Sequence, residues 1–233
     1  MAALADRLVS LWYWTNVNTW ARLLVRINLR LEIQGLENIP RRGPLILASN
    51  HVNVADPPVI VVSTPRRIAM MAKQELFDIP IIGLLYRFYG CIPVRRAEAD
   101  LAALRKCKVA LDKGLVLGMF PEGTRTRKPG LIRGEPGTAI VALRSGAPIL
   151  PVAITGTETI KLPRSFFHWL TRDRPKVKLI FGKPFQLEQY ERVRKPEIEE
   201  ATETIMRQIA ALLPEEYRGV YAETISRKIS ASQ

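Results

Sequence analysis

The sequence predicts an α/β fold with a mixed, mostly parallel sheet flanked by helices, and three observations carry this prediction. Short apolar runs alternate along the chain with segments whose apolar residues follow helical spacing. Neither an internal repeat nor a low-complexity linker divides these segments. With 233 residues and 47% hydrophobic content, the chain is long enough to bury one full core. Strands that alternate with helices build layered α/β domains.

The predicted strands are short and apolar. They cover residues 44–49, 66–72, 90–94, 115–120, 148–155 and 176–182. The predicted helices cover residues 57–63, 74–88 with a break near Pro80, 97–113, 137–146 and a closing amphipathic stretch from Ile198 to Leu212. Two prolines begin the first of these helices and glycines end the third and fourth, as the preferences of helix termini require.

The charge balance indicates anionic partners. Thirty-five Lys and Arg against 22 Asp and Glu give a formal net charge of +13. Such a surface attracts phosphates, anionic lipid headgroups, nucleic acid or acidic proteins, and charge alone does not choose among them. The two cysteines form no CxxC pattern, so we expect neither a disulfide framework nor a zinc site.

Residues 1–30 predict an amphipathic helical segment that lies in a membrane interface, followed by a main domain over 31–233. Fourteen uncharged residues separate Arg7 from Arg22. This stretch is too short, and contains too many polar residues, for a membrane-spanning helix. Three of the four tryptophans fall within the first 20 residues, and arginines follow at 22, 26 and 30. This composition is typical of interfacial helices. The alternative is that the aromatic residues pack onto the domain. We expect no secretory signal here, because a basic start and a continuous apolar stretch are missing.

The stretch "SNHVNVADPP" (49–58) raises the question of whether His51 and Asp56 form a pair. In one helix the two side chains would point about 140° apart, and in an extended chain they would lie roughly 16 Å apart. Pro57 disfavours helical geometry at Asp56, so a compact turn after the strand can bring the carboxylate back to the imidazole. The aspartate would then fix the tautomer and leave the other ring nitrogen as a base. The alternative is a helix-capping aspartate and a surface histidine. His168 and Asp173 repeat the same spacing without a preceding strand, so the spacing alone is weak evidence.

The segment "FPEGTRTRKPG" (120–130) also follows an apolar strand. Its Arg125, Arg127 and Lys128 offer donors that match phosphate geometry, and Gly123 permits a close backbone approach. The alternative is a solvated basic loop. In α/β sheets, sites gather beyond the carboxyl ends of strands, so this segment and His51 are expected to converge. Lys73, Arg95 and Arg96 also follow predicted strands, and each is as compatible with a solvated charge as with a ligand contact.

Four stretches in order, "NHVNVAD", "GCIPVRR", "FPEGTR" and "APILPVAI", resemble the sequence blocks of the glycerolipid acyltransferases, in particular the PlsC-type 1-acyl-sn-glycerol-3-phosphate acyltransferases. The resemblance covers roughly residues 34–185, and "KQELFDIPIIG" between the first two blocks is similar as well. It implies a glycerol-3-phosphate acyltransferase-like fold. Pro151 lies in the fourth block, which the family links to the acyl side and to packing.

The resemblance also implies roles for individual residues. His51 matches the general base that deprotonates the acceptor hydroxyl, and Asp56 matches the residue that orients it. The remaining implied site residues bind the phosphate or glycerol part of the acceptor: Lys73, Arg96, Glu122, Gly123, Thr124, Arg125 and Arg127. Neither cysteine is expected to serve as an acyl-enzyme nucleophile.

The implied reaction moves a fatty acyl chain from acyl-CoA or acyl-carrier protein, as co-substrate, to the sn-2 hydroxyl of lysophosphatidic acid, giving phosphatidic acid. No metal or other cofactor is implied. We expect an anionic membrane surface as a partner, at the cytoplasmic face of the cell membrane, with monotopic or peripheral attachment. Nucleic acid is not expected, because no helix-turn-helix, RRM or zinc-finger pattern is present. The alternatives are an enzyme of the same fold acting on glycerol-3-phosphate or another lyso-acceptor such as a lyso-ornithine lipid, and a non-catalytic basic protein.

Overall fold

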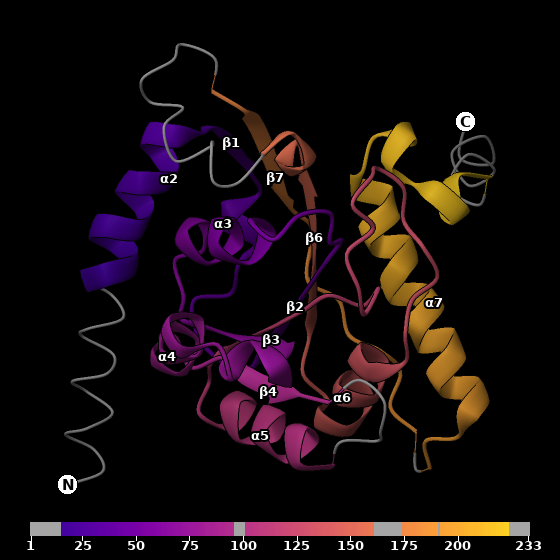
Figure 1. The fold of residues 1–233 in the computed structure, drawn as a ribbon. Helices are drawn as coiled ribbons and strands as arrows, with labels where there is room; N and C mark the ends of the chain where they lie inside the picture. Colours follow the sequence, from indigo (N-terminus) through magenta and orange to yellow (C-terminus); the bar gives the residue numbers. More distant parts are fainter. Residues whose placement is uncertain (1–14, 96–100, 161–173, 191, 224–233) are drawn as a thin grey trace, which may run out of the picture.

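The computed structural model describes residues 15–95, 101–160, 174–190 and 192–223. Its centre is a seven-stranded sheet in the order β1-β7-β6-β2-β5-β3-β4 (Figure 1). The strands are β1 (Arg30–Gln34), β2 (Leu45–Ser49), β3 (Ile68–Lys73), β4 (Ile92–Val94), β5 (Val116–Met119), β6 (Ile149–Thr155) and β7 (Lys176–Phe181). Every neighbouring pair is parallel except β6 and β7, which run antiparallel. The predicted mixed, mostly parallel sheet is therefore confirmed.

Helices connect the strands in the predicted order. The longer ones are α2 (Arg22–Asn28), α3 (Asp56–Ser63), α4 (Pro80–Phe88), α5 (Leu101–Asp112), α6 (Gly137–Ser145) and α7 (Lys195–Leu212). The short ones are a π-helical segment, η1 (Asn16–Ala21), and the 3₁₀ turns η2 (Leu36–Asn38), η3 (Gln74–Phe77), η4 (Thr157–Thr159), η6 (Glu215–Tyr217) and η7 (Gly219–Tyr221). The predicted break near Pro80 is confirmed, since η3 ends at Phe77 and Pro80 begins α4.

Different helices cover the two faces of the sheet, so the fold has three layers (Figure 1). Alternate residues of β2 serve the two cores, because side chains of a strand alternate between faces. Leu45 and Leu47 pack with the apolar residues of α3, whereas Ile46 and Ala48 belong to the core under α5, α6 and α7. All five residues of β2 are buried. The central strand is thus covered on both faces, and its carboxyl end is held in a fixed place.

The structure departs from the sequence prediction at the start of the chain. Arg30 begins β1 and pairs with Lys176 of β7, so the four-residue spacing of the arginines at 22, 26 and 30 does not follow one helix. The preceding α2 ends at Asn28. Trp12, Tyr13 and Trp14 lie outside the described residues, as does the second histidine. None of the helices in the described part of the chain combines the length and the apolar character needed to cross a bilayer.

Candidate active site

Three strands of the sheet end at the same edge and carry the two segments singled out in the sequence. β2 lies between β5 and β6 and runs parallel to both, with Ala48 opposite Met119 on one side and Pro151 on the other. The chain leaves β2 toward His51 and leaves β5 toward Glu122. Because parallel strands point the same way, both loops emerge at the carboxyl edge. The expected convergence of the two segments is confirmed by a hydrogen bond, 2.8 Å long, from the His51 backbone N–H to Glu122 Oε1.

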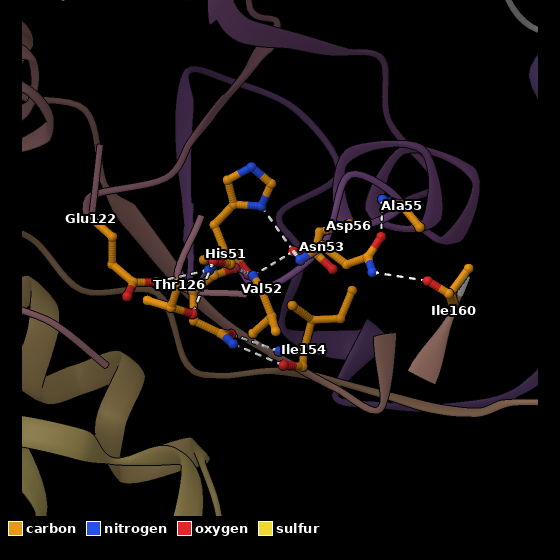
Figure 2. A network of polar contacts seen from close by, with 11 residues as sticks. His51, Val52, Asn53, Ala55, Asp56, Glu122, Thr126, Ile154 and Ile160 are labelled. Atoms are coloured by element: carbon orange, nitrogen blue, oxygen red, sulfur yellow. Dashed lines mark hydrogen bonds and ion pairs between the residues drawn. The ribbon is translucent and has the colours of Figure 1, made fainter. Parts of the chain in front are cut away.

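His51 and Asp56 form a direct pair. The distance from His51 Nδ1 to Asp56 Oδ2 is 2.8 Å (Figure 2). The same carboxylate oxygen also accepts the backbone N–H groups of Val52 and Asn53, at 2.7 and 2.8 Å. These bonds close the compact turn that the spacing required, and the Asp56 N–H donates back to the Asn53 carbonyl at 3.1 Å. Asp56 is therefore the first residue of α3, and its side chain holds the preceding loop instead of capping the helix.

The pairing determines which nitrogen of His51 is available for chemistry. An ionised carboxylate only accepts hydrogen bonds, so Nδ1 carries the proton and Nε2 keeps its lone pair. The second ring nitrogen points away from the other residues drawn in Figure 2. Asp56 is fully buried and His51 is 9% exposed, so only a small part of the histidine faces outward. A neutral imidazole in this state accepts a proton from a bound hydroxyl group.

Two contacts that the sequence analysis missed hold His51 in place. The Phe120 ring stacks on the imidazole, with ring centroids 4.0 Å apart and planes 18° from parallel. Asn50 forms two hydrogen bonds with the backbone of Ile154 in β6, one in each direction, both 2.8 Å long. Both residues stand beside a residue that the sequence analysis selected, but their contacts join segments far apart in the chain.

Glu122 is the second buried acid of the site after Asp56, and both of its oxygens accept backbone donors. Oε1 takes the N–H of His51, and Oε2 takes the N–H of Ile132 at 3.2 Å. Burial raises the pKa of Glu122 to about 7; the two N–H donors oppose the rise, and the negative charge of Asp56 adds to it. Glu122 therefore links the histidine loop to the segment 131–134. Its implied role in shaping a glycerol site stays a prediction.

The cationic segment after Glu122 is tied to the same loop. The Thr126 N–H donates to the His51 carbonyl at 3.0 Å. Arg125, Arg127 and Lys128 are exposed, and none of them forms an ion pair with a carboxylate of the described residues. Thr124 is exposed as well. A cluster of unpaired cations beside a base is suited to an anionic substrate.

The backbone of this segment takes two left-handed conformations, at Gly123 (φ 64°) and at Arg127 (φ 60°). Glycine adopts this conformation at little cost, which accounts for Gly123 beside the buried acid. Of the other predicted cations, Lys73 is the last residue of β3. Lys73 forms an ion pair with Glu75 at 2.9 Å, and Arg96 lies outside the described residues.

Neither cysteine is placed for nucleophilic chemistry. Burial raises the pKa of the Cys91 thiol to about 12, which keeps it protonated at neutral pH. Cys107 is fully buried in the core beneath α5. Within the described residues, no group of three or more His, Cys, Asp or Glu side chains is arranged to hold a metal ion.

Known proteins are similar to this chain in fold and, over part of its length, in sequence. The family model described as Acyltransferase matches residues 30–155. A chloroplastic 1-acyl-sn-glycerol-3-phosphate acyltransferase of Arabidopsis thaliana is 31% identical over 144 residues, which cover 60% of this chain and 40% of that protein. A 1-acyl-sn-glycerol-3-phosphate acyltransferase of Bacillus subtilis is 29% identical over 165 residues, or 70% of this chain and 78% of that protein.

A solved structure agrees with the fold. The crystal structure of the 1-acyl-sn-glycerophosphate acyltransferase PlsC from Thermotoga maritima has a TM-score of 0.60 to this chain at 23% identity, covering 88% of this chain and 94% of that one. The chain spans about two fifths of the length of its plant relatives. The family match, by contrast, covers more than half of this chain and takes in both segments that build the site. The chain therefore belongs to the acyltransferase family.

Proposed function

We propose that this protein transfers a fatty acyl group from acyl-CoA or acyl-carrier protein to the sn-2 hydroxyl of 1-acylglycerol-3-phosphate, giving phosphatidic acid for phospholipid synthesis. The single observation that carries the proposal is the buried His51–Asp56 pair, which uses Nδ1 and leaves Nε2 for a substrate, beside exposed cations that form no ion pair with a carboxylate of the described residues. The relatives in Arabidopsis thaliana and Bacillus subtilis are named for this activity, and the match includes both segments of the site.

The proposed reaction uses a single direct transfer. His51 Nε2 takes the proton of the acceptor hydroxyl as its oxygen attacks the thioester carbonyl carbon. The tetrahedral intermediate collapses, the carbon–sulfur bond breaks, and the leaving thiolate takes the proton back from the imidazolium. Asp56 stabilises the imidazolium while it exists, because its carboxylate accepts the Nδ1–H at 2.8 Å. The scheme assigns no acyl-cysteine intermediate and no cofactor besides the acyl donor.

The cations are assigned to the anionic parts of the substrates. Arg125 is the candidate for the acceptor phosphate, because it follows Glu122 closely and its guanidinium can donate two parallel hydrogen bonds. The charge of Arg125 also acts on Tyr86 of α4. Burial and the nearby Cys91 raise the pKa of Tyr86, and Arg125 opposes this rise. Glycerol-3-phosphate carries the same phosphate, so an assay must separate it from the lipid acceptor.

Attachment to the cytoplasmic face of the membrane, monotopic or peripheral, is part of the proposal. α2 turns Leu23, Leu24 and Ile27 outward instead of into the core, and the exposed Trp20 of η1 precedes them. Their spacing places them on one side of the helix, as in helices that lie in a bilayer interface. Replacing Leu24 and Ile27 by asparagine should weaken co-sedimentation with anionic vesicles. Unchanged co-sedimentation would count against this segment as an anchor.

The test of the activity uses the purified full chain. Lysophosphatidic acid, glycerol-3-phosphate and a lyso-ornithine lipid are each offered with acyl-CoA and with acyl-carrier protein, and products are separated by mass. We expect product from lysophosphatidic acid and a loss of about 10²- to 10⁴-fold in kcat for His51→Ala, because general-base catalysis contributes this much. Full turnover by that variant, or product from the other acceptors only, would overturn the assignment.

A further inference from the structure

The helix α4 carries an outward apolar row that the proposed chemistry does not use. Ile81 is 76% exposed and Leu84 is 53% exposed. Leu85 and Phe88 continue the row on the same side, at the spacing i, i+3, i+4 and i+7. A surface helix of a soluble domain normally buries such a row. Here the row faces outward, and Ile79 and Ile82 widen it.

The orientation of α4 is fixed by its other face. Gly83 packs so closely on η3 that an alanine Cβ would lie 2.1 Å from the Phe77 carbonyl oxygen. Tyr86 makes an edge-to-face contact with the Phe77 ring, with centroids 5.6 Å apart. Arg87 also donates to the Phe77 carbonyl, at 3.1 Å. The helix therefore uses its smallest residue and a tyrosine for packing, and it cannot turn its aliphatic row inward without losing these contacts.

The charge carried by α4 itself is basic, whereas acids occur only in the turn before it. α4 contains one charged residue, Arg87, and no acid. Arg125 lies within electrostatic range of Tyr86 on the same helix. In the turn that leads into α4, Lys73 pairs with Glu75 and Asp78 follows, while the whole chain carries a net charge of +13. An apolar row on a helix whose only charge is positive, in a strongly basic protein, complements a bilayer with anionic headgroups, whereas an acidic protein would match the cations but not the aliphatic side chains.

The place of α4 in the fold also favours contact with a bilayer. In Figure 1, α2, α3 and α4 line the same side of the sheet, and α6 and α7 cover the other. α3 begins at Asp56, the partner of the histidine, and the exposed Val54 lies in the loop between them. The outward apolar residues of α2, the histidine loop and α4 thus come from neighbouring elements on one side of the molecule.

We propose that α4 is a second contact with the membrane, separate from the N-terminal segment, and that it docks on an anionic lipid bilayer. The contact brings the histidine loop against the bilayer surface, where a lipid acceptor resides. The binding part of this proposal stands without the proposed function, whereas the part that concerns acceptor delivery rests on it.

The test compares the full chain with the double variant Ile81→Asn/Leu84→Asn. Both side chains are exposed, so we expect thermal unfolding to stay unchanged. The matched control is Val109→Asn, which replaces an equally exposed apolar residue on α5. We measure co-sedimentation with vesicles of phosphatidylcholine and phosphatidylglycerol in equal amounts. Partitioning should fall by at least about tenfold for the double variant, because two buried aliphatic side chains are lost from the lipid contact, and stay unchanged for the control.

Kinetics then separate membrane docking from other roles of α4. A short-chain acceptor dissolved as monomers should be acylated by the double variant as well as by the wild type, whereas turnover of long-chain acceptor in vesicles should fall with partitioning. Three results would overturn the proposal: unchanged partitioning, loss of turnover with both acceptors, or lipid-free self-association of the wild type that the double variant abolishes. If the wild type acylates neither acceptor, the proposed function fails while the partitioning result still decides the docking.

Discussion

Replacing Asp56 by asparagine separates the charge of this residue from its geometry. In the wild type a single oxygen, Oδ2, accepts the His51 Nδ1–H and two backbone N–H groups. An asparagine oxygen in the same place can accept all three. Its NH₂ group then takes the position of Oδ1, which is buried and has no hydrogen-bond partner in the described residues. We therefore expect a folded variant that is less stable by about 1–3 kcal/mol, the cost of a buried unsatisfied donor.

The catalytic loss follows from the missing charge. At the observed 2.8 Å, a carboxylate and an imidazolium attract each other by roughly 6 kcal/mol at an effective dielectric of about 20. The imidazolium is only partly formed in the transition state, so about half of this attraction, roughly 3 kcal/mol, is lost. We expect kcat to fall by about 10²-fold, with little change in KM for the acceptor.

The assay measures steady-state acyl transfer to lysophosphatidic acid together with circular dichroism on the same preparations. Asp112→Asn is the matched control, because Asp112 is an exposed carboxylate on α5 that pairs with Lys108. The control should keep wild-type kinetics. A folded Asp56→Asn variant with kcat within about threefold of the wild type would refute the reasoning, since the buried charge would then contribute almost nothing to the proton transfer.

Three further predictions concern the surroundings of the pair. The pKa of Glu122, about 7 against an ordinary 4.5, lies above its unfolded value, so its contribution to stability is present below about pH 4.5 and lost as pH rises through 7. When urea unfolding is measured from pH 4.5 to 8, the free energy of unfolding of the wild type should fall by about 3 kcal/mol relative to that of Glu122→Gln. The same pH dependence of stability in both proteins would contradict this. Phe120→Leu removes the ring stacked on His51, and we expect kcat to fall by about two- to tenfold, because such aromatic pairs contribute about 0.5–1.5 kcal/mol; an unchanged kcat would show that the stack does not orient the imidazole. Gly123→Ala should lower the free energy of unfolding by about 1–2 kcal/mol, because φ is 64° and the added methyl would meet a neighbouring side chain at 2.9 Å. Gly137→Ala should not lower the free energy of unfolding in this way, because the added methyl would meet no atom within 4 Å. Equal losses of stability in the two variants would refute the argument.

The fold was largely predictable from local patterns. Each strand and helix predicted between residues 44 and 212 is present within a few residues of its predicted range in the described residues, because apolar periodicity and the preferences of proline and glycine act between near neighbours in the chain. The strand β1 was missed for a related reason. It lies at the edge of the sheet, alternates exposed with half-buried residues and contains charges, so its sequence does not differ from a surface helix or loop. Only its pairing with β7 makes it a strand.

The sequence was enough to select the residues of the candidate site, but it did not predict which of them contact each other. The spacing between His51 and Asp56 recurs between His168 and Asp173. The local sequence does not show whether the turn between such a pair brings the two side chains into contact. The resemblance assigned Glu122 to the acceptor, yet its carboxylate lies against the backbone of a residue 71 positions earlier in the chain. Contacts over such separations depend on strand order and register, which local sequence does not specify.

By itself the sequence determined the order of strands and helices, the basic surface and the two segments that carry candidate chemistry. Tertiary structure alone decided that β2 and β5 lie side by side and parallel, so that the buried His51, Asp56 and Glu122 and the partly buried Phe120 share one cluster. It also decided that α4 turns its aliphatic residues outward, because the close approach of Gly83 to η3 leaves no other orientation. The physical reason is the same in both cases. Periodicity and turn preferences are properties of neighbouring residues, whereas burial and pairing are properties of surfaces that meet only after the chain has folded.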